Sequence, residues 1–263
     1  MTKIAAITGG SSGLGFAFAE ILGKQGYDIV ILARNKQRID NAVEELTKKK
    51  FNATGIICDI TNEKQVKEAA DKIKSDYGKI DFLILNAGEV TTKLLCDYKD
   101  ISELKKDLDI DLWGTIQTAY FFTPLLVGGS KMLMISSGFG LLGGAGYSIY
   151  CAAKAGIVNF GEALRRELLC KNISVYVACP GDMDTPQFRN EMKNQPDWMK
   201  QDSPRTLMTV EDSAKKIIKQ CKGHKKFLIL TGTIVIILAI GTRIFPRKLR
   251  DWIIDNMLPR PKH

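Results

Sequence analysis

Tyr150 and Lys154 stand four residues apart in the segment YSIYCAAKAG, residues 147–156. On an α-helix this spacing places one side chain above the other, so the Tyr150 phenol meets the Lys154 ammonium, whereas Tyr147 has Cys151 at the same offset. An isolated tyrosine has a pKa of about 10, and a neighbouring cation favours its phenolate. The pair is therefore a candidate for proton transfer, although an ordinary pair on a helix surface has the same spacing.

Other common catalytic groups are scarce. The two histidines, His224 and His263, lie in basic or terminal segments, so neither a Ser-His-Asp relay nor a histidine metal cluster can be built. The cysteines are scattered, with no Cys-x-x-Cys pair and no secretory segment before them, so we expect reduced thiols in a protein that faces the cytoplasm. They are Cys58, Cys96, Cys151, Cys170, Cys179 and Cys221. Neither a disulfide nor a bound metal is expected.

The positive charge of the chain is concentrated near its C-terminus. The formal net charge is +9, and residues 222–263 contribute +7 of it, with nine Lys or Arg and two Asp or Glu. A nucleic-acid-binding protein would carry basic residues on a folded face, interleaved with aromatic side chains. Here they flank an apolar run, which indicates a membrane surface, and no nucleic acid, as the partner.

The elements that must position the chemical groups follow from the apolar pattern. Short apolar runs are typical of buried strands, and they alternate with longer helical stretches. The runs are residues 3–10, 28–34, 53–60, 81–88, 131–137 and 173–181. This alternation predicts an α/β fold, a doubly wound, parallel Rossmann-type sheet with helices on both faces. A length of 263 residues with 45% hydrophobic residues fits one globular domain.

A glycine-rich turn, TGGSSGLG, connects the first predicted strand to the first predicted helix. Gly9 permits a tight turn, Gly13 lets the backbone approach a pyrophosphate, and Gly15 permits close packing where the helix begins. The N-terminus of that helix offers amide donors and a partial positive charge to phosphate. The turn therefore predicts a dinucleotide site at the carboxyl end of the sheet, with a purely structural turn as the alternative.

The end of the second predicted strand indicates which dinucleotide binds. A site for NAD commonly has an acidic side chain there, which binds the ribose 2′-hydroxyl. The segment LARNKQR instead has Arg34, with Lys36 and Arg38 nearby, and no acid. These residues favour a 2′-phosphate, with Ser11 or Ser12 as a further donor, so NADP (NADPH) is the predicted cofactor. The alternative is a solvated basic turn.

Several short segments together resemble the short-chain dehydrogenases/reductases, over about residues 3–231. The matching segments are TGGSSGLG at 8–15, CDI with Asp59, NAG at 86–88, Ser137, the Tyr150/Lys154 pair and PGDMDT at 180–185. Ser137 stands thirteen residues before Tyr150, which is the separation that this family uses between its serine and its tyrosine. The resemblance selects Tyr150 rather than Tyr147 as the reactive tyrosine.

The resemblance implies carbonyl reduction by hydride transfer from a nicotinamide cofactor. In the family, the tyrosine exchanges a proton with the substrate oxygen, the serine bonds that oxygen, and the lysine also binds the nicotinamide ribose. The resemblance implies these roles for Tyr150, Ser137 and Lys154, respectively. The implied cofactor contacts are Thr8, Gly9, Ser11, Ser12, Gly13, Leu14, Gly15, Arg34, Arg38, Asp59, Ile60, Asn86, Ala87, Gly88, Tyr150, Lys154, Pro180, Gly181 and Thr185.

The resemblance also implies a lid and an assembly. In the family, the segment that follows Thr185 is a mobile lid over the substrate. Family members commonly form homodimers or homotetramers through two long helices, here at about residues 101–126 and 148–170.

One position departs from the family pattern. The family usually has an asparagine in an N-x-x-G segment, and here Asp111 stands three residues before Gly114. The family asparagine helps to hold a water chain to the lysine, largely through its main-chain carbonyl, so an aspartate can remain a member of this catalytic relay. Alternatively, its negative charge raises the pKa values of Lys154 and Tyr150, or it is an ordinary helix residue.

Three hypotheses for the function remain. The segments GGSSGLG, LARN and PGDMDTPQF, followed by an apolar and basic tail, are similar to the 3-ketodihydrosphingosine reductase branch of the family. That similarity implies NADPH-dependent reduction of a long-chain keto-lipid in sphingolipid synthesis. The second hypothesis is another apolar substrate, such as a steroid, a retinoid or a 3-oxoacyl group. The third is a catalytically silent NADP-binding module at a membrane.

The chain is expected to divide into a catalytic domain, residues 1–231, and a membrane-association segment, residues 232–263. The uncharged stretch from Phe227 to Thr242 is shorter than a membrane span requires, and its first part matches the last core strand of the family. Behind it, Pro246 begins a segment with an apolar helical face and a basic flank. The face is Leu249, Trp252, Ile253 and Met257, and the flank is Arg247, Lys248 and Arg250.

This pattern predicts that residues 233–242 insert into one leaflet beside an interfacial helix, with the catalytic domain facing the cytoplasm. Packing of the tail on a partner subunit is the alternative.

Overall fold

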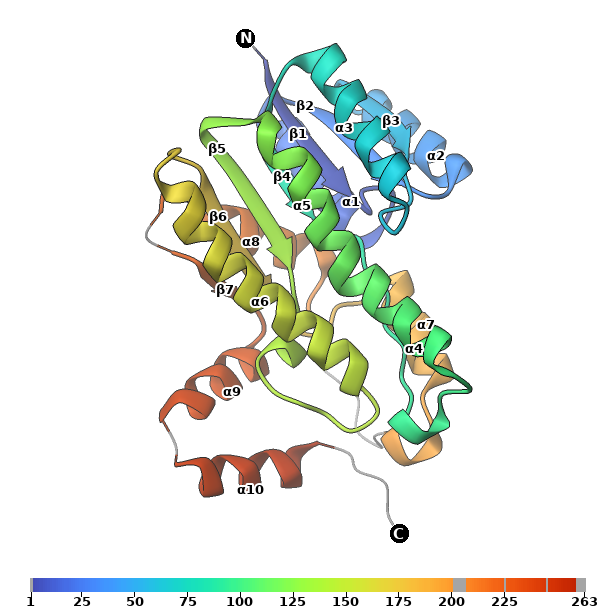
Figure 1. Cartoon of the computed structure of the whole chain (residues 1–263), viewed down its shortest axis with the longest axis vertical. Helices are drawn as coiled ribbons and strands as arrows, with labels where there is room; N and C mark the ends of the chain where they lie inside the picture. Colours follow the sequence, from blue (N-terminus) through green and yellow to red (C-terminus); the bar gives the residue numbers. More distant parts are fainter. Residues whose placement is uncertain (1, 201–206, 225, 245, 259–263) are drawn as a thin grey trace.

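The computed structural model describes residues 2–200, 207–224, 226–244 and 246–258. Within these residues, seven parallel strands form one sheet in the order β3-β2-β1-β4-β5-β6-β7 (Figure 1). The strands are β1 (Lys3–Thr8), β2 (Tyr27–Ala33), β3 (Ala53–Ile57), β4 (Ile80–Leu85), β5 (Leu126–Ile135), β6 (Ser174–Cys179) and β7 (Leu228–Leu230). The prediction of a doubly wound, parallel α/β sheet is therefore confirmed.

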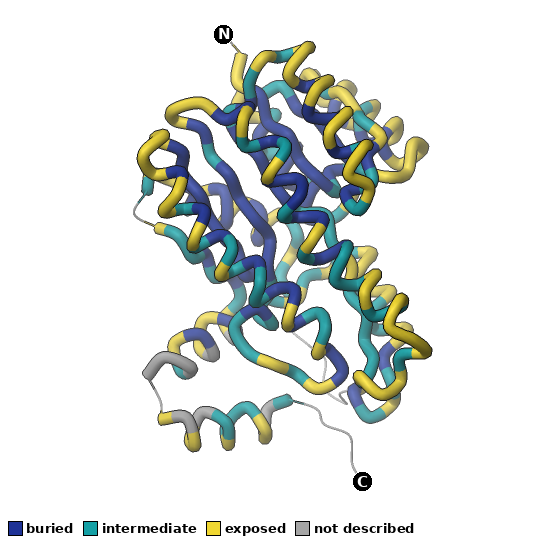
Figure 2. Tube along the Cα trace, viewed as in Figure 1, coloured by how far each residue is buried: buried dark blue, intermediate teal, exposed yellow. Residues whose placement is uncertain are grey.

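Helices cover both faces of the sheet, and each face has its own apolar core (Figures 1 and 2). One face packs against α1 (Gly13–Lys24), α2 (Lys36–Lys48) and α8 (Val210–Gln220). The other packs against α3 (Glu63–Tyr77), α5 (Gly114–Phe122) and α6 (Ser148–Leu169). Because both faces of every central strand are buried, the strands read as continuous apolar runs rather than as alternating ones.

The strand order reverses beside β1, because β2 and β3 lie on one side of it and β4 to β7 on the other. The connections diverge at this point, which leaves a crevice beyond the carboxyl ends of β1 and β4. Thr8 and Leu85, the last residues of these two strands, are paired in register. The glycine-rich turn after β1 and the segment 86–88 after β4 therefore lie side by side.

A π-helical turn, Asp109–Trp113, interrupts the long helix between α4 (Ile101–Leu108) and α5. Turns of this kind widen the helix by one residue and occur frequently at functional sites. Asp111 lies in the middle of the turn and is buried. The sequence predicts the helix here but not the local change of helical type.

Two helices follow β7 at the carboxyl edge of the sheet, α9 (Thr233–Ile244) and α10 (Arg247–Met257), and together they form a helical hairpin (Figure 1). Val235 and Ala239 of α9 are buried, whereas Ile236, Ile237 and Ile240 are exposed. The expectation that all of residues 233–242 is free to enter lipid is therefore wrong, because the core takes up one face of the helix. No helix of the described residues is long and apolar enough to cross a membrane.

Candidate active site

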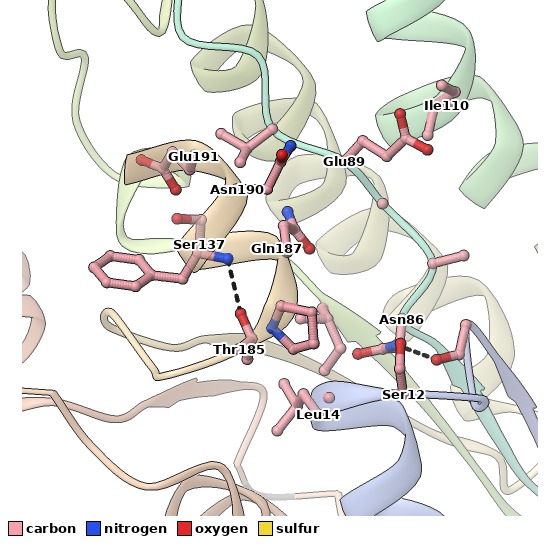
Figure 3. Close-up of a pocket in the computed structure, with 18 of the residues that line it drawn as sticks. Ser12, Leu14, Asn86, Glu89, Ile110, Ser137, Thr185, Gln187, Asn190 and Glu191 are labelled. Carbon is pink, nitrogen blue, oxygen red and sulfur yellow. Dashed lines mark hydrogen bonds between the residues drawn. The ribbon is translucent and has the colours of Figure 1, made fainter. Parts of the chain in front are cut away.

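A cavity of about 880 Å³ opens at the carboxyl edge of the sheet. The structure brings most of the predicted site residues to its walls. They are Gly9, Ser11, Ser12, Gly13, Leu14, Arg34, Arg38, Asp59, Ile60, Asn86, Ala87, Gly88, Ser137, Tyr150, Lys154, Pro180, Gly181 and Thr185. The remaining three, Thr8, Gly15 and Asp111, do not line the cavity. Figure 3 shows its walls, with Ser12 in the glycine-rich turn, Asn86 beside that turn, and Gln187, Asn190 and Glu191 on the helix that follows Thr185.

The glycine-rich turn packs tightly against the segment that follows β4. Gly9 has a φ of +65°, which a residue with a side chain rarely adopts, and Gly15 has no space for a side chain. A Cβ at Gly15 would lie 2.3 Å from the Gly9 carbonyl oxygen and 2.7 Å from the Asn86 side-chain nitrogen. The two glycines thus let the turn close over the end of β1, which directs the N-terminus of α1 at the cavity.

Thr8 supports this arrangement from beneath. Its side chain is buried, and its Oγ1 accepts hydrogen bonds from the backbone N–H groups of Asn86 at 2.9 Å and Ala87 at 3.1 Å. The Asn86 side chain in turn donates to the Thr8 carbonyl oxygen at 3.1 Å. Thr8 therefore positions a wall of the cavity rather than contacting a ligand.

Asp59 and Ile60, at the end of the loop after β3, line the same part of the cavity. The Asp59 carboxylate accepts hydrogen bonds from the Thr61 N–H at 2.9 Å and the Thr61 hydroxyl at 2.8 Å. The Gln117 side chain of α5 donates to the Ile60 carbonyl oxygen. These bonds fix the loop against the helix layer, with Asp59 at the cavity wall.

The catalytic candidates meet at the other end of the cavity. Ser137 follows β5, and its hydroxyl hydrogen-bonds with that of Tyr150, which stands in the first turn of α6. Lys154 follows one turn later, and its ammonium nitrogen lies 5.3 Å from the centroid of the Tyr150 ring. The predicted meeting of the phenol and the ammonium is thus present, with the cation over the ring face.

The pKa of Tyr150 is raised, which differs from the expected shift toward phenolate. Burial is the largest cause, and the negative charge of Asp111 adds to it, while the hydrogen bond with Ser137 acts in the opposite direction. The physical reasons are thus the burial of the phenol and, second, the Asp111 charge, which also pairs with Lys154 so that this cation is not isolated. In this structure Tyr150 is therefore a protonated phenol at neutral pH and can donate a proton.

Lys154 and Asp111 form a buried ion pair. The distance between Lys154 Nζ and Asp111 Oδ1 is 3.2 Å, and the two side chains are only 5% and 4% exposed. The Glu89 N–H also donates to Asp111 Oδ1, at 3.1 Å. Burial raises the pKa of Asp111, and the Lys154 ammonium and this N–H partly offset the effect. Asp111 therefore acts on the site through its side-chain carboxylate.

The backbone around Lys154 is anchored to the sheet. The buried Ser136 hydroxyl, one residue before Ser137, donates to the Lys154 carbonyl oxygen at 2.8 Å. This bond ties α6 directly to the end of β5. It explains how a serine on a loop and a lysine on a helix keep a fixed separation.

Arg34, at the nucleotide end of the cavity, is paired with an acidic side chain. It follows β2, and its guanidinium forms an ion pair with the carboxylate of Glu89, the residue directly after the segment 86–88. Glu89 also lines the cavity. Glu89 is a cavity residue that the sequence motifs do not predict. The one sequence signal is its position in NAGEV, immediately after the segment 86–88 that is expected to contact the cofactor.

The helix α7 (Pro186–Asn194) covers the cavity, and Thr185 caps it by accepting a hydrogen bond from the Phe188 N–H at 3.0 Å. Three further side chains hold this cover to the start of α6. The Tyr147 hydroxyl donates to Glu191 at 2.5 Å and accepts from Gln195 at 2.9 Å. Tyr147 and Gln195 are buried. Tyr147, which the family resemblance does not select as the reactive tyrosine, thus has a role in positioning the lid.

Comparisons with known proteins agree with this site. A family model described as short chain dehydrogenase matches residues 3–196. A carbonyl reductase family member 4 from Xenopus laevis is 32% identical over 187 residues, covering 70% of this chain and 77% of the relative. A human 3-oxoacyl-(acyl-carrier-protein) reductase is 31% identical over 192 residues, covering 72% and 79%. An 11-beta-hydroxysteroid dehydrogenase-like protein from Arabidopsis thaliana is 34% identical over 195 residues, or 71% of this chain, which spans 62% of that relative.

Solved structures share the fold. A short-chain dehydrogenase from Burkholderia cenocepacia in complex with NADP has a TM-score of 0.81 at 21% identity, with 98% of each chain covered. An actinorhodin polyketide ketoreductase with NADPH has a TM-score of 0.80 at 21% identity, covering 88% of this chain and 95% of the other. A short-chain dehydrogenase from Burkholderia phymatum in complex with NAD has a TM-score of 0.81 at 21% identity, covering 100% and 98%.

The geometry places a glycine-rich helix N-terminus at one end of a cavity and a protonated tyrosine, a serine and a buried lysine at the other. This combination and the family match over residues 3–196 lead to one conclusion: the chain belongs to the short-chain dehydrogenase family and is an oxidoreductase.

Proposed function

We propose that this oxidoreductase reduces the carbonyl group of an apolar substrate with NADPH, and that the substrate is a long-chain keto-lipid such as 3-ketodihydrosphingosine. The observation that carries the proposal is the meeting of Ser137, Tyr150 and Lys154 at one end of a cavity whose other end has Arg34 and Arg38. A reductase needs a proton donor at the carbonyl oxygen, which the protonated phenol of Tyr150 provides, whereas an alcohol dehydrogenase needs a base there. Ser137, bonded to the same hydroxyl, orients the substrate oxygen toward Tyr150.

The cavity fits a nicotinamide dinucleotide along its length. The N-terminus of α1 and the residues of the glycine-rich turn would bind the pyrophosphate, and Asp59 and Ile60 would contact the adenine. Lys154 would bind the nicotinamide ribose, and Thr185 lines the cavity beside Gly13, where an added Cβ would lie 3.7 Å from the Thr185 Cγ2 atom. When bound, the cofactor supplies the hydride, while the protein holds the carbonyl and provides the proton.

The preference for NADPH rests on Arg34 and Arg38. Both line the nucleotide end of the cavity, at the end of β2 and in the first turn of α2. An arginine fork binds a phosphate through two parallel hydrogen bonds, which a ribose hydroxyl cannot match. Two solved structures of this fold contain NADP or NADPH and one contains NAD, so the fold accommodates either dinucleotide.

Apolar side chains of the lid and of the segments beside Tyr150 support the proposal of an apolar substrate. Trp198 and Met199, which follow α7, pack against Gly146, where an added Cβ would lie 2.9 Å from the Met199 sulfur. Val90 and Phe139 join the same apolar cluster beside Tyr150, and both of them line the cavity. A steroid, retinoid or 3-oxoacyl substrate remains the second candidate, since relatives are named for hydroxysteroids and 3-oxoacyl groups.

A membrane role for the C-terminal hairpin completes the proposal. Its exposed apolar side chains are Ile236, Ile237, Ile240, Leu249 and Trp252, with Lys248 beside them. The side chains of Met257, Arg247 and Arg250 and residues 259–263 lie outside the described part of the chain. A Cβ at Gly138 would lie 3.0 Å from Val235 of α9, so the hairpin adjoins the loop that carries Ser137. This arrangement suits uptake of a lipid at a membrane surface, with the domain on the cytoplasmic side.

We also propose pairing of two chains through the long helices, as the family resemblance implies. Trp113 and Tyr120 on the π-helical turn and α5, and Leu169 at the end of α6, are large apolar side chains that are exposed in the single chain. Burial in a homodimer or homotetramer would remove them from water.

The test is consumption of NADPH by the purified full-length protein with 3-ketodihydrosphingosine, a 3-oxoacyl thioester and a ketosteroid. We expect turnover, with the highest kcat/KM for the sphingoid ketone. Turnover of only the second or third substrate would replace the keto-lipid assignment by the alternative. Absence of turnover with each of them, despite NADPH binding, would support the catalytically silent reading.

A further inference from the structure

The ion pair between Arg34 and Glu89 spans the nucleotide end of the cavity. Arg34 follows β2 and Glu89 follows the segment after β4, on either side of β1 in the sheet. Both residues line the cavity, and their side chains are 54% and 49% exposed. The pair therefore lies in the open part of the cavity, where the proposed 2′-phosphate would bind.

The backbone of Glu89 is held in place independently of Arg34. Its N–H donates to the buried Asp111 carboxylate at 3.1 Å, and the preceding Gly88 packs against the same group. On the other side, Asn35 follows Arg34 and caps α2 by accepting a hydrogen bond from the Arg38 N–H at 2.9 Å. Both partners thus project from fixed backbone into one region of the cavity.

A carboxylate and a phosphate compete for the same arginine. The guanidinium has five N–H donors in a planar fork, and either anion uses the same paired donors. Glu89 occupies one of the two terminal nitrogens, Nη2. A bound 2′-phosphate must displace this carboxylate or accept a like charge beside it, whereas a 2′-hydroxyl meets neither cost.

We propose that Glu89 is a specificity-determining residue, which competes with the cofactor 2′-phosphate for Arg34 and so reduces the preference for NADPH over NADH. This inference rests on the proposed binding of NADPH. An NADPH site with an unopposed arginine would discriminate more strongly. In this protein, a carboxylate from beyond the fourth strand is already paired with the arginine that follows the second strand.

The experiment is a titration of the full-length protein with NADPH and with NADH, followed by cofactor fluorescence, without substrate. The variants are Glu89→Gln, Arg34→Ala and the double variant. Glu44→Gln is the matched control, because Glu44 forms an exposed ion pair with Lys48 on α2 and does not line the cavity. Exposed ion pairs are weak, so we expect Glu89→Gln to lower the Kd for NADPH by about three- to fivefold.

The same variant should leave the Kd for NADH within about twofold, and Glu44→Gln should change neither. In the Arg34→Ala background, the effect of Glu89→Gln on NADPH should fall to less than half, because competition requires the arginine. An unchanged or increased Kd for NADPH in Glu89→Gln would overturn the proposal, as would an effect that persists in full without Arg34. If wild type binds neither dinucleotide, the proposed function itself fails. If wild type binds NADPH but Glu89→Gln does not bind it more tightly, only the role of Glu89 fails.

Discussion

The Lys154 ammonium, one helical turn after Tyr150, lies 3.2 Å from the carboxylate of Asp111, which the π-helical turn of a different helix supplies. Both side chains are almost completely buried. A pair at this depth needs both members, because either charge alone would be costly to bury. Asp111 also acts on Tyr150, because its negative charge adds to burial, the larger cause, in raising the pKa of the phenol.

We predict that Asp111→Asn lowers stability and shifts the pH profile. Loss of the carboxylate leaves the buried Lys154 ammonium without its counter-charge, which we expect to lower the free energy of unfolding by about 3 kcal/mol. It also removes a charge that raises the pKa of Tyr150. Reduction requires the protonated phenol, so the rate falls as pH rises through this pKa, and in the variant that fall should occur at lower pH.

Urea unfolding and the pH dependence of kcat measure the two effects of Asp111→Asn. Asp107→Asn is the control, because Asp107 lies one turn earlier and bonds Thr91 and Tyr98 instead. That control should keep the wild-type pH profile. A shift of the alkaline limb of Asp111→Asn to higher pH would contradict the electrostatic role.

We predict that Tyr147→Phe weakens lid closure without affecting the chemical step. The change removes the hydroxyl that joins Glu191 and Gln195 to the start of α6. A lost hydrogen bond to a carboxylate costs about 1.5–3 kcal/mol, so we expect KM to rise by about tenfold or more while kcat stays within about twofold. Steady-state kinetics with the best ketone substrate measure both.

Tyr98→Phe is the control for this variant. It also removes a tyrosine–carboxylate bond, at 2.9 Å to Asp107, but Tyr98 does not line the cavity. An equal rise of KM in both variants, or a loss of kcat alone in Tyr147→Phe, would rule out the lid role.

We predict that exposed apolar residues of α9 are required for membrane binding and not for folding. The double change Ile237→Asp and Ile240→Asp places two charges on side chains that are 60% and 51% exposed. It should abolish sedimentation with anionic vesicles while NADPH binding is retained. These point changes are preferable to truncation before α9, because Val235 and Ala239 are part of the packed core.

Ile57→Asp is the control, since Ile57 is also exposed but ends the edge strand β3, at the opposite edge of the sheet from β7. It should bind vesicles as wild type does. Vesicle binding that survives in the α9 variant would assign membrane association to another surface or to none.

The sequence predicts those parts of the site that depend on local spacing. Tyr150 and Lys154 are one helical turn apart, and Thr8 to Gly15 join a strand to a helix, so their relative positions follow from regular geometry. The sheet edge then brings Ser137 and Asn86 to the same cavity. Each of these placements needs only the type and order of the elements.

The sequence does not predict contacts between side chains from distant segments. Arg34 and Glu89 are 55 residues apart, and Tyr147 and Glu191 are 44 apart. Which side chains meet depends on how loops pack at the carboxyl edge, and no periodicity encodes it. The raised pKa of Tyr150 is among the alternatives that the sequence offers, but its largest cause, the burial of the phenol, depends on the same packing.

The most direct test of the central claim, that Tyr150 donates the proton in an NADPH-dependent carbonyl reduction, is the NADPH consumption of Tyr150→Phe with the best ketone substrate. The variant lacks only the hydroxyl, so the ring still fills its space beside Ser137 and Lys154. We expect kcat to fall by about 10²- to 10⁴-fold, while the Kd for NADPH stays within about twofold. A kcat within tenfold of wild type, at unchanged cofactor affinity, would contradict the assignment of Tyr150 as the proton donor.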